Sequence, residues 1–254
     1  MCTLALYFRC FDIYPLLAAA NRDESFDRPS SAPALQHTRP KILAGKDLRA
    51  GGTWFGVNEY GVMVGILNRR IDGRTLPATA VRSRGLLCLD LLQFENVEGA
   101  DHFLAAHDVQ YNPFTVVCAD REGALVAYNN EAKVIIQHLN PGLHVFSSAA
   151  TLDLNSAKAD RAYERFAGLL QRHREYLDHS EEWLRALQTI LADHSVRDGS
   201  ENPSDAVCVH RENAGTVSSS VAFLAQTRNR FETFHCPGAP CRTSFAGLLP
   251  LPLR

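Results

Sequence analysis

The order of strand-like and helix-like segments is the feature of this sequence that most constrains its fold. Two helical blocks, at about 83–107 and 156–194, separate three runs of strand-like sequence. A doubly wound parallel sheet requires strands and helices that alternate one by one, whereas here whole runs of strands alternate with helix pairs. The order therefore predicts an α+β fold of packed sheets with helices outside, in one domain spanning residues 1–254.

The individual segments are short and end at polar or turn residues. The expected strands are 3–9, 14–21, 51–68 (two strands around a turn), 114–119, 124–129, 133–139, 143–148, 206–211 and 216–225. The first two strands predict one hairpin, and 51–68 predicts a second. Ser83 and Ser180 are expected to begin helices as N-caps.

Composition narrows the functional classes. The net charge of −2 argues against a protein that binds polyanions such as nucleic acid over its whole surface. No apolar run approaches the roughly 20 residues of a membrane span, so no stable membrane insertion is expected. Arg9 and Asp12 interrupt the apolar start, which argues against a signal peptide. Seven scattered cysteines, an odd number, fit reduced thiols and predict a cytoplasmic location.

Cys2 directly follows the initiator methionine, and two interpretations are open. It is either the first residue of a buried strand or, after methionine removal, the N-terminus itself. In the second case one residue carries both a thiol, with a pKa near ~8.5, and an α-amine, with a pKa near ~8. The amine can then accept the proton of the thiol, which is the chemistry of an N-terminal nucleophile.

The polar run Asn21, Arg22, Asp23 and Glu24 ends the second expected strand. Taken alone, it is typical of a solvated turn. If the first two strands pair antiparallel, however, Arg22 and Asp23 come close to Cys2. An aspartate can orient the α-ammonium, and an arginine lowers the pKa of a thiol. The pattern therefore also fits a nucleophile, a base and an orienting acid.

Several motifs together resemble those of the NRDE family, also called the transport and Golgi organisation 2 family. They are Cys2, NRDE at 21–24, GGTWFG at 51–56, NRR at 68–70, SRG at 83–85 and GTVSS at 215–219. This family is similar to N-terminal-nucleophile hydrolases of the choloylglycine hydrolase and acyltransferase kind. The resemblance implies a four-layer αββα sandwich in which Cys2 is nucleophile and base. It also implies that Asp23 holds the amine, with Arg22 beside it.

Further candidates surround this centre. Asn21 and backbone amides are expected to stabilise an oxyanion. The related hydrolases usually have an asparagine near the stretch 145–152, where this chain offers Ser148 instead. The expected ligand contacts are Glu24, Trp54, Asn68, Arg69, Arg70, Arg84, Ser148, Thr216 and Ser218. The basic stretch 68–84 is either a solvated loop or a clamp for an anion such as a haem propionate or a coenzyme A phosphate.

Metal and cofactor motifs are not evident. The loop HCPGAPC at 235–241 has one C-x₄-C with a single flanking histidine, so a structural turn and no metal site are expected. The sequence predicts a Cys2-dependent hydrolase or acyltransferase acting on a small amide or thioester, with no required cofactor. The alternative is a non-catalytic carrier or chaperone of haem or acyl-CoA, since the resemblance links the family to haem handling and lipid metabolism. The sequence leaves the oligomeric state open.

Overall fold

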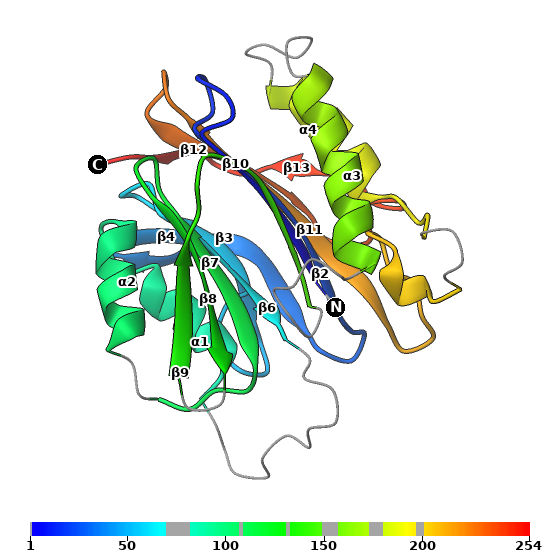
Figure 1. The fold of residues 1–254 in the computed structure, drawn as a ribbon, viewed down its shortest axis with the longest axis horizontal. Helices are drawn as coiled ribbons and strands as arrows, with labels where there is room; N and C mark the ends of the chain where they lie inside the picture. Colours follow the sequence, from blue (N-terminus) through cyan, green and yellow to red (C-terminus); the bar gives the residue numbers. More distant parts are fainter. Residues whose placement is uncertain are drawn as a thin grey trace. The chain divides into compact units, whose positions relative to one another are not determined.

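The computed structural model describes residues 2–69, 82–106, 109–130, 133–148, 157–172, 180–196 and 201–254. Its contacts divide the chain into two compact units. The first comprises Met1–Asp27, Pro141–Ser147 and Thr151–Pro250, and the second Arg28–Asn140, Ser148–Ala150 and Leu251–Arg254. Each unit has its own antiparallel sheet, its own pair of helices and its own core (Figure 1). The expectation of a single domain stays a prediction.

The sheet of the first unit has the strand order β10-β1-β2-β11-β12-β13. These strands are β1 (Thr3–Phe8), β2 (Leu16–Ser25), β10 (Gly142–Ser147), β11 (Ala214–Ala225), β12 (Arg230–Cys236) and β13 (Ala246–Gly247). The predicted first hairpin is confirmed, with Thr3 opposite Asn21 and Phe8 opposite Leu16. Each pair of neighbouring strands is antiparallel. Along every strand, successive side chains point to opposite faces of the sheet.

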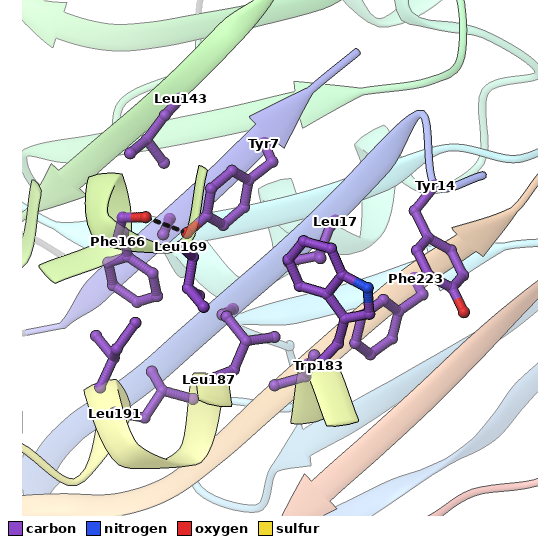
Figure 2. Close-up of a cluster of buried hydrophobic side chains, with 14 of the residues drawn as sticks. Tyr7, Tyr14, Leu17, Leu143, Phe166, Leu169, Trp183, Leu187, Leu191 and Phe223 are labelled. Carbon is purple, nitrogen blue, oxygen red and sulfur yellow. Dashed lines mark hydrogen bonds between the residues drawn. The ribbon is translucent and has the colours of Figure 1, made fainter. Parts of the chain in front are cut away.

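One face of this sheet is covered by α3 (Ala157–Arg172) and α4 (Ser180–Leu191). Both helices are amphipathic, and their apolar stripes meet alternate residues of the strands, as Figure 2 shows. Phe166 and Leu169 of α3 and Trp183 of α4 are buried in this cluster. The hydroxyl of Tyr7, in β1, donates a 2.6 Å hydrogen bond to the carbonyl oxygen of Phe166. The residues of β1 and β2 that share this face are odd-numbered, which also decides where Asn21 and Asp23 point.

The second unit is a seven-stranded meander in sequence order. Its strands are β3 (Ser30–Thr38), β4 (Lys41–Asp47), β5 (Phe55–Asn58), β6 (Met63–Asn68), β7 (Phe114–Ala119), β8 (Ala124–Asn130) and β9 (Lys133–His138). The helices α1 (Arg84–Leu91) and α2 (Val97–Ala105) pack on one face of this sheet. The remaining short elements are the 3₁₀ turn η2 (Pro203–Asp205) in the first unit and β14 (Leu251–Pro252) in the second. Within the described ranges, every helix is too short or too polar to cross a membrane.

A close backbone contact explains two of the glycine-containing motifs. A Cβ placed on Gly52, in GGTWFG, would lie 2.2 Å from the carbonyl carbon of Gly85, in SRG. The Thr53 N–H also donates to the Gly85 carbonyl oxygen at 3.0 Å. Only glycine allows the two chain segments to approach so closely. These motif residues therefore serve to dock the start of α1 against the chain that enters β5.

Some sequence-based expectations were wrong. Strands β3, β4 and β12 had not been expected, and the segment 206–211, expected as a strand, is irregular apart from a bridge between His210 and Gly215. Cys208 N–H donates to the Asp193 carbonyl beyond α4 instead of to a neighbouring strand. Ser83 occupies the N-cap position of α1, but its side chain makes no capping bond. The predicted start of α4 at Ser180 is confirmed.

We expect Tyr7→Phe to lower the free energy of unfolding by about 1 kcal/mol, because the buried Phe166 carbonyl loses its hydrogen-bond donor. Tyr163→Phe is the matched control, since Tyr163 lies on the exposed side of α3. Urea denaturation of both variants measures the difference. Equal stability of the two variants would show that the Tyr7 bond contributes nothing.

Candidate functional site

Cys2 lies one residue before β1, at the end of the first unit's sheet. Its Sγ is 3.8 Å from the backbone carbonyl oxygen of Asp23, and the residue is half-buried. The register of the β1–β2 hairpin produces this proximity. Burial raises the pKa of the Cys2 thiol above its ordinary value, while the Lys158 ammonium acts in the opposite direction. The sulfur is thus held as a neutral thiol and requires a base to become a nucleophile.

The carboxylate of Asp23 is the centre of a buried polar network. Lys158, in the first turn of α3, places its Nζ 2.7 Å from Oδ2, and both side chains are only 2% exposed. The hydroxyl of Thr216, in β11, donates to Oδ1 at 2.6 Å. The same hydroxyl accepts a 2.9 Å bond from the Val209 N–H. Asp23 therefore connects β2, α3, β11 and the segment before β11 through a single side chain.

The Asn21 side chain is fully occupied by structural contacts. Its amide nitrogen donates to the carbonyl oxygens of Leu191 and Val207, each at 2.9 Å. Its Oδ1 accepts a hydrogen bond from the Ser219 hydroxyl. These bonds fasten the end of α4 to the sheet. The predicted role of Asn21 as an oxyanion donor stays a prediction, and it would require one of the two amide bonds to be released.

An irregularity in β11 allows the two networks to coexist. Thr216 is opposite Asp23 and Ser218 is opposite Arg22, so the register shifts at Val217. Asp23 and Asn21 are two residues apart, whereas the side chains that bind them, Thr216 and Ser219, are three apart. In a regular strand, residues three apart face opposite sides. The bulge at Val217 turns both hydroxyls toward the same face, as bulges near functional sites often do.

Two buried hydroxyls on opposite faces of this sheet have no hydrogen-bond partner among the described residues. Thr3, the residue after Cys2, is opposite Asn21 and so shares its helix-covered face. Ser218 pairs across the strands with Arg22, which is buried on the face of β2 opposite Asp23. An unsatisfied buried polar group costs about 1–3 kcal/mol unless bound water or a ligand satisfies it. Glu24, the next residue, is half-buried and accepts a bond from the Ser25 N–H.

The predicted ligand contacts divide between the two units. Those in the first unit, which also holds Cys2 and Arg22, are Glu24, Thr216 and Ser218. Those in the second unit are Trp54, Asn68, Arg69, Arg84 and Ser148. Arg70 lies outside the described residues. The structure brings the first group together around β2 and β11.

The described arginines of the basic stretch contact their own chain. Arg69 donates to the Asn129 carbonyl at 2.7 Å and lies over the Tyr128 ring. Arg84 donates to the Pro113 carbonyl at 2.8 Å. Arg82 forms a two-bond ion pair with Asp90. These contacts give each guanidinium a structural role, and the anion clamp stays a prediction.

Lys158 is the site residue that sequence reasoning missed. The signal was present in α3, where Lys158, Ala162, Phe166 and Leu169 form the buried stripe at helical spacing. A lysine on an apolar stripe requires a buried partner of opposite charge. Asp23 was the unexplained acid at the edge of the predicted core, so the two residues could have been paired from the sequence.

We expect Lys158→Met to lower the free energy of unfolding by about 3–5 kcal/mol, because it leaves the buried Asp23 charge without its partner. The double variant Asp23→Asn/Lys158→Met removes both charges and should recover most of that loss. Lys133→Met, at an exposed position at the start of β9, is the control for loss of a lysine. Chemical denaturation of wild type, the two single variants and the double variant gives the coupling energy. Additive effects of Asp23→Asn and Lys158→Met would contradict the pairing.

The comparison with solved structures shows the fold. A structure of the C2A mutant of a conjugated bile acid hydrolase from Clostridium perfringens has a TM-score of 0.53 at 11% identity, covering 100% of this chain and 98% of that one. A Caenorhabditis elegans ortholog of N-acylethanolamine-hydrolyzing acid amidase has a TM-score of 0.50 at 13% identity, covering 87% and 92%. The predicted α+β fold of the N-terminal-nucleophile hydrolases, with its two helix pairs and two sheets, is confirmed.

The comparison with curated sequences shows the family. A Transport and Golgi organization 2 homolog from Mus musculus is 31% identical over 147 residues, which is 54% of this chain and 51% of that protein. The Homo sapiens homolog is 29% identical over 150 residues, which is 54% of this chain and 51% of that protein. The chain spans about half the length of the curated relatives it matches. The family model described as Transport and Golgi organisation 2 matches residues 1–234, and the chain belongs to that family.

Proposed function

We propose that this protein is an acyl hydrolase or acyltransferase in which Cys2 is the nucleophile. The observation that carries the proposal is the position of the Cys2 sulfur, half-buried and 3.8 Å from the Asp23 carbonyl, beside a charged network sealed inside the first unit. The unsatisfied hydroxyl of Ser218, on the same face of the sheet as Arg22, supports a ligand on that face. A buried charge pair at a cysteine is costly to maintain for stability alone and is typical of functional sites.

The proposed reaction begins with removal of Met1, which gives Cys2 a free α-amine. The amine accepts the thiol proton, and the thiolate attacks the carbonyl carbon of an amide or thioester. When the tetrahedral intermediate collapses, the bond to the leaving group breaks, and the ammonium returns the proton to that group. Water then hydrolyses the Cys2 thioester, or a second nucleophile takes the acyl group.

Asp23 and Lys158 hold this arrangement in place. A carboxylate has about four acceptor positions, so the bonds from Thr216 and Lys158 do not by themselves exhaust it. We assign a further position to the α-ammonium of Cys2, which Asp23 would orient. Burial and the Asp23 carboxylate raise the pKa of the Cys2 thiol, and the Lys158 ammonium offsets part of this effect. Backbone N–H groups are the first candidates for the oxyanion donors, each worth about 2.7–4 kcal/mol where present.

The substrate class comes from the fold neighbours by analogy only. They are named as a conjugated bile acid hydrolase and an N-acylethanolamine-hydrolyzing acid amidase. For this chain we propose a small acyl amide or acyl thioester, because the thiolate chemistry at Cys2 is the same for both. Fold alone does not define the substrate.

We expect a thiol-reactive acyl probe to label wild-type protein at Cys2 and to leave Cys2→Ala unlabelled at that site, whereas any label on the exposed Cys241 should be the same in both proteins. The reason is that the α-amine activates this thiol, whereas burial raises the pKa of Cys10 to about 11 and so keeps its thiol neutral. Intact-protein mass spectrometry followed by peptide mapping gives the site. The mass also reports whether Met1 has been removed. Cys10→Ala, the loss of another half-buried thiol of the same unit, is the control and should label like wild type.

Equal labelling of wild type and Cys2→Ala, or a retained Met1, would contradict the nucleophile assignment. The carrier hypothesis, in which the protein binds haem or an acyl-CoA without reaction, makes a different prediction. Affinity for haem or palmitoyl-CoA would then survive Cys2→Ala and fall when Arg69 and Arg70 are both changed to glutamine. Titration of each ligand against these variants separates the two hypotheses.

A further inference from the structure

Four side chains outside the proposed reaction gather beyond the end of α4. They are His194, Cys208, His210 and Cys241, and one potential ligand atom of each lies within 4.8 Å of the others. His194 comes after α4, Cys208 and His210 belong to the irregular segment after η2, and Cys241 is in the loop after β12. We propose that these four residues bind a zinc ion that is structural in role.

The three distances among the ligand atoms of Cys208, His210 and Cys241 are close to the edges of a metal-centred tetrahedron. With Zn–S bonds of about 2.3 Å, two sulfur ligands lie about 3.8 Å apart. The Sγ atoms of Cys208 and Cys241 are 3.8 Å apart. With Zn–N bonds of about 2.0–2.1 Å, sulfur and nitrogen ligands lie about 3.5 Å apart. The Nε2 of His210 is 3.8 Å from the Cys208 sulfur and 3.2 Å from the Cys241 sulfur.

One hydrogen bond orients the His194 ring for metal binding. The Nδ1 of His194 lies 3.1 Å from the Cys208 carbonyl oxygen, which can only accept a hydrogen bond. An Nδ1–H that donates to this oxygen leaves the lone pair of Nε2 for a metal, the outer-shell arrangement common at zinc histidines.

The charges of the four side chains are compatible with a divalent ion. A Zn²⁺ ion displaces both thiol protons, and with two neutral imidazoles the completed site has no net charge. Four protein ligands leave no open coordination position, which is the pattern of a structural site. The Cys241 residue is exposed, so an ion can reach the site from solvent.

The ion would hold together the backbone that supports the Asp23 network. Val209, between two of the proposed ligands, donates its N–H to the Thr216 hydroxyl, which in turn donates to Asp23. Fixing Cys208 and His210 therefore fixes the position of Thr216. This role does not depend on whether Cys2 is catalytic.

The expectation of no metal site rested on the spacing of HCPGAPC. In the structure only Cys241 of that loop joins the cluster. The sulfur of Cys236 lies 3.2 Å from the carbonyl oxygens of Gly238 and Thr243 and closes the loop as a turn. His235 contacts Ser220 instead. The other proposed ligands precede Cys241 by 31 positions or more, so no local motif reveals the site.

The test uses protein purified with an affinity tag that contains no histidine. After dialysis we expect about one zinc ion per chain by elemental analysis, and the Co²⁺-loaded protein should show the thiolate-to-cobalt absorption of a tetrahedral site. Loss of an outer-shell partner of a metal ligand lowers metal affinity by about 10–100-fold. Cys241→Ser removes a proposed ligand itself and should weaken zinc binding by at least that factor. Because Cys241 is exposed, this variant should fold, and its melting temperature should no longer respond to chelator.

Cys10→Ser is the matched control, since Cys10 is a half-buried thiol of the same unit that is not part of the cluster. It should bind zinc like wild type and lose thermal stability on chelation. The proposal is overturned if wild type takes up neither zinc nor cobalt. It is also overturned if the isolated protein contains a Cys208–Cys241 disulfide, or if Cys10→Ser loses as much metal as Cys241→Ser.

Discussion

The ion pair between Asp23 and Lys158 is the interaction on which the first unit depends. It joins the hairpin that carries Cys2 to the first turn of α3, and Thr216 extends it to β11. Two charges of opposite sign inside a protein are stable only as a pair, because the desolvation of either one alone costs several kcal/mol. The ion pair therefore holds α3 on the strand whose register with β1 places Asp23 beside Cys2.

Asn21 binds the end of α4 to the sheet, as Asp23 binds the start of α3. Its amide reaches the carbonyl oxygens at the end of that helix and in the segment before β11. The adjacent polar residues of NRDE thus point alternately, with two of them toward the helices and Arg22 toward the other face. Asn21 and Asp23 are buried in contacts with the helices, so the motif is not the solvated turn that its composition alone suggests.

Periodicity and element order were enough to predict the first hairpin, the α1–α2 and α3–α4 pairs and the fold class. The segment 206–211 was misjudged because its alternating apolar residues look like a strand, whereas its N–H groups find partners beyond α4 and on a side chain of β11. Lys158 was overlooked although its position on the apolar stripe of α3 indicated a buried partner, whereas the group around Cys208 carries no such signal because its members are distant in sequence. Only the folded chain brings such residues together.

The extra residue in β11 bears on how relatives of this protein should be aligned. Val217 occupies a place that has no counterpart in the facing strand β2. An alignment that puts a gap one position too early or too late would assign the hydroxyl that binds Asp23 to the wrong column. The side chain at 217 is half-buried, so its replacement disturbs little. Adding or removing a residue there would change the register of β11 against β2. The physical constraint on this stretch is therefore its length rather than the identity of the residue at 217.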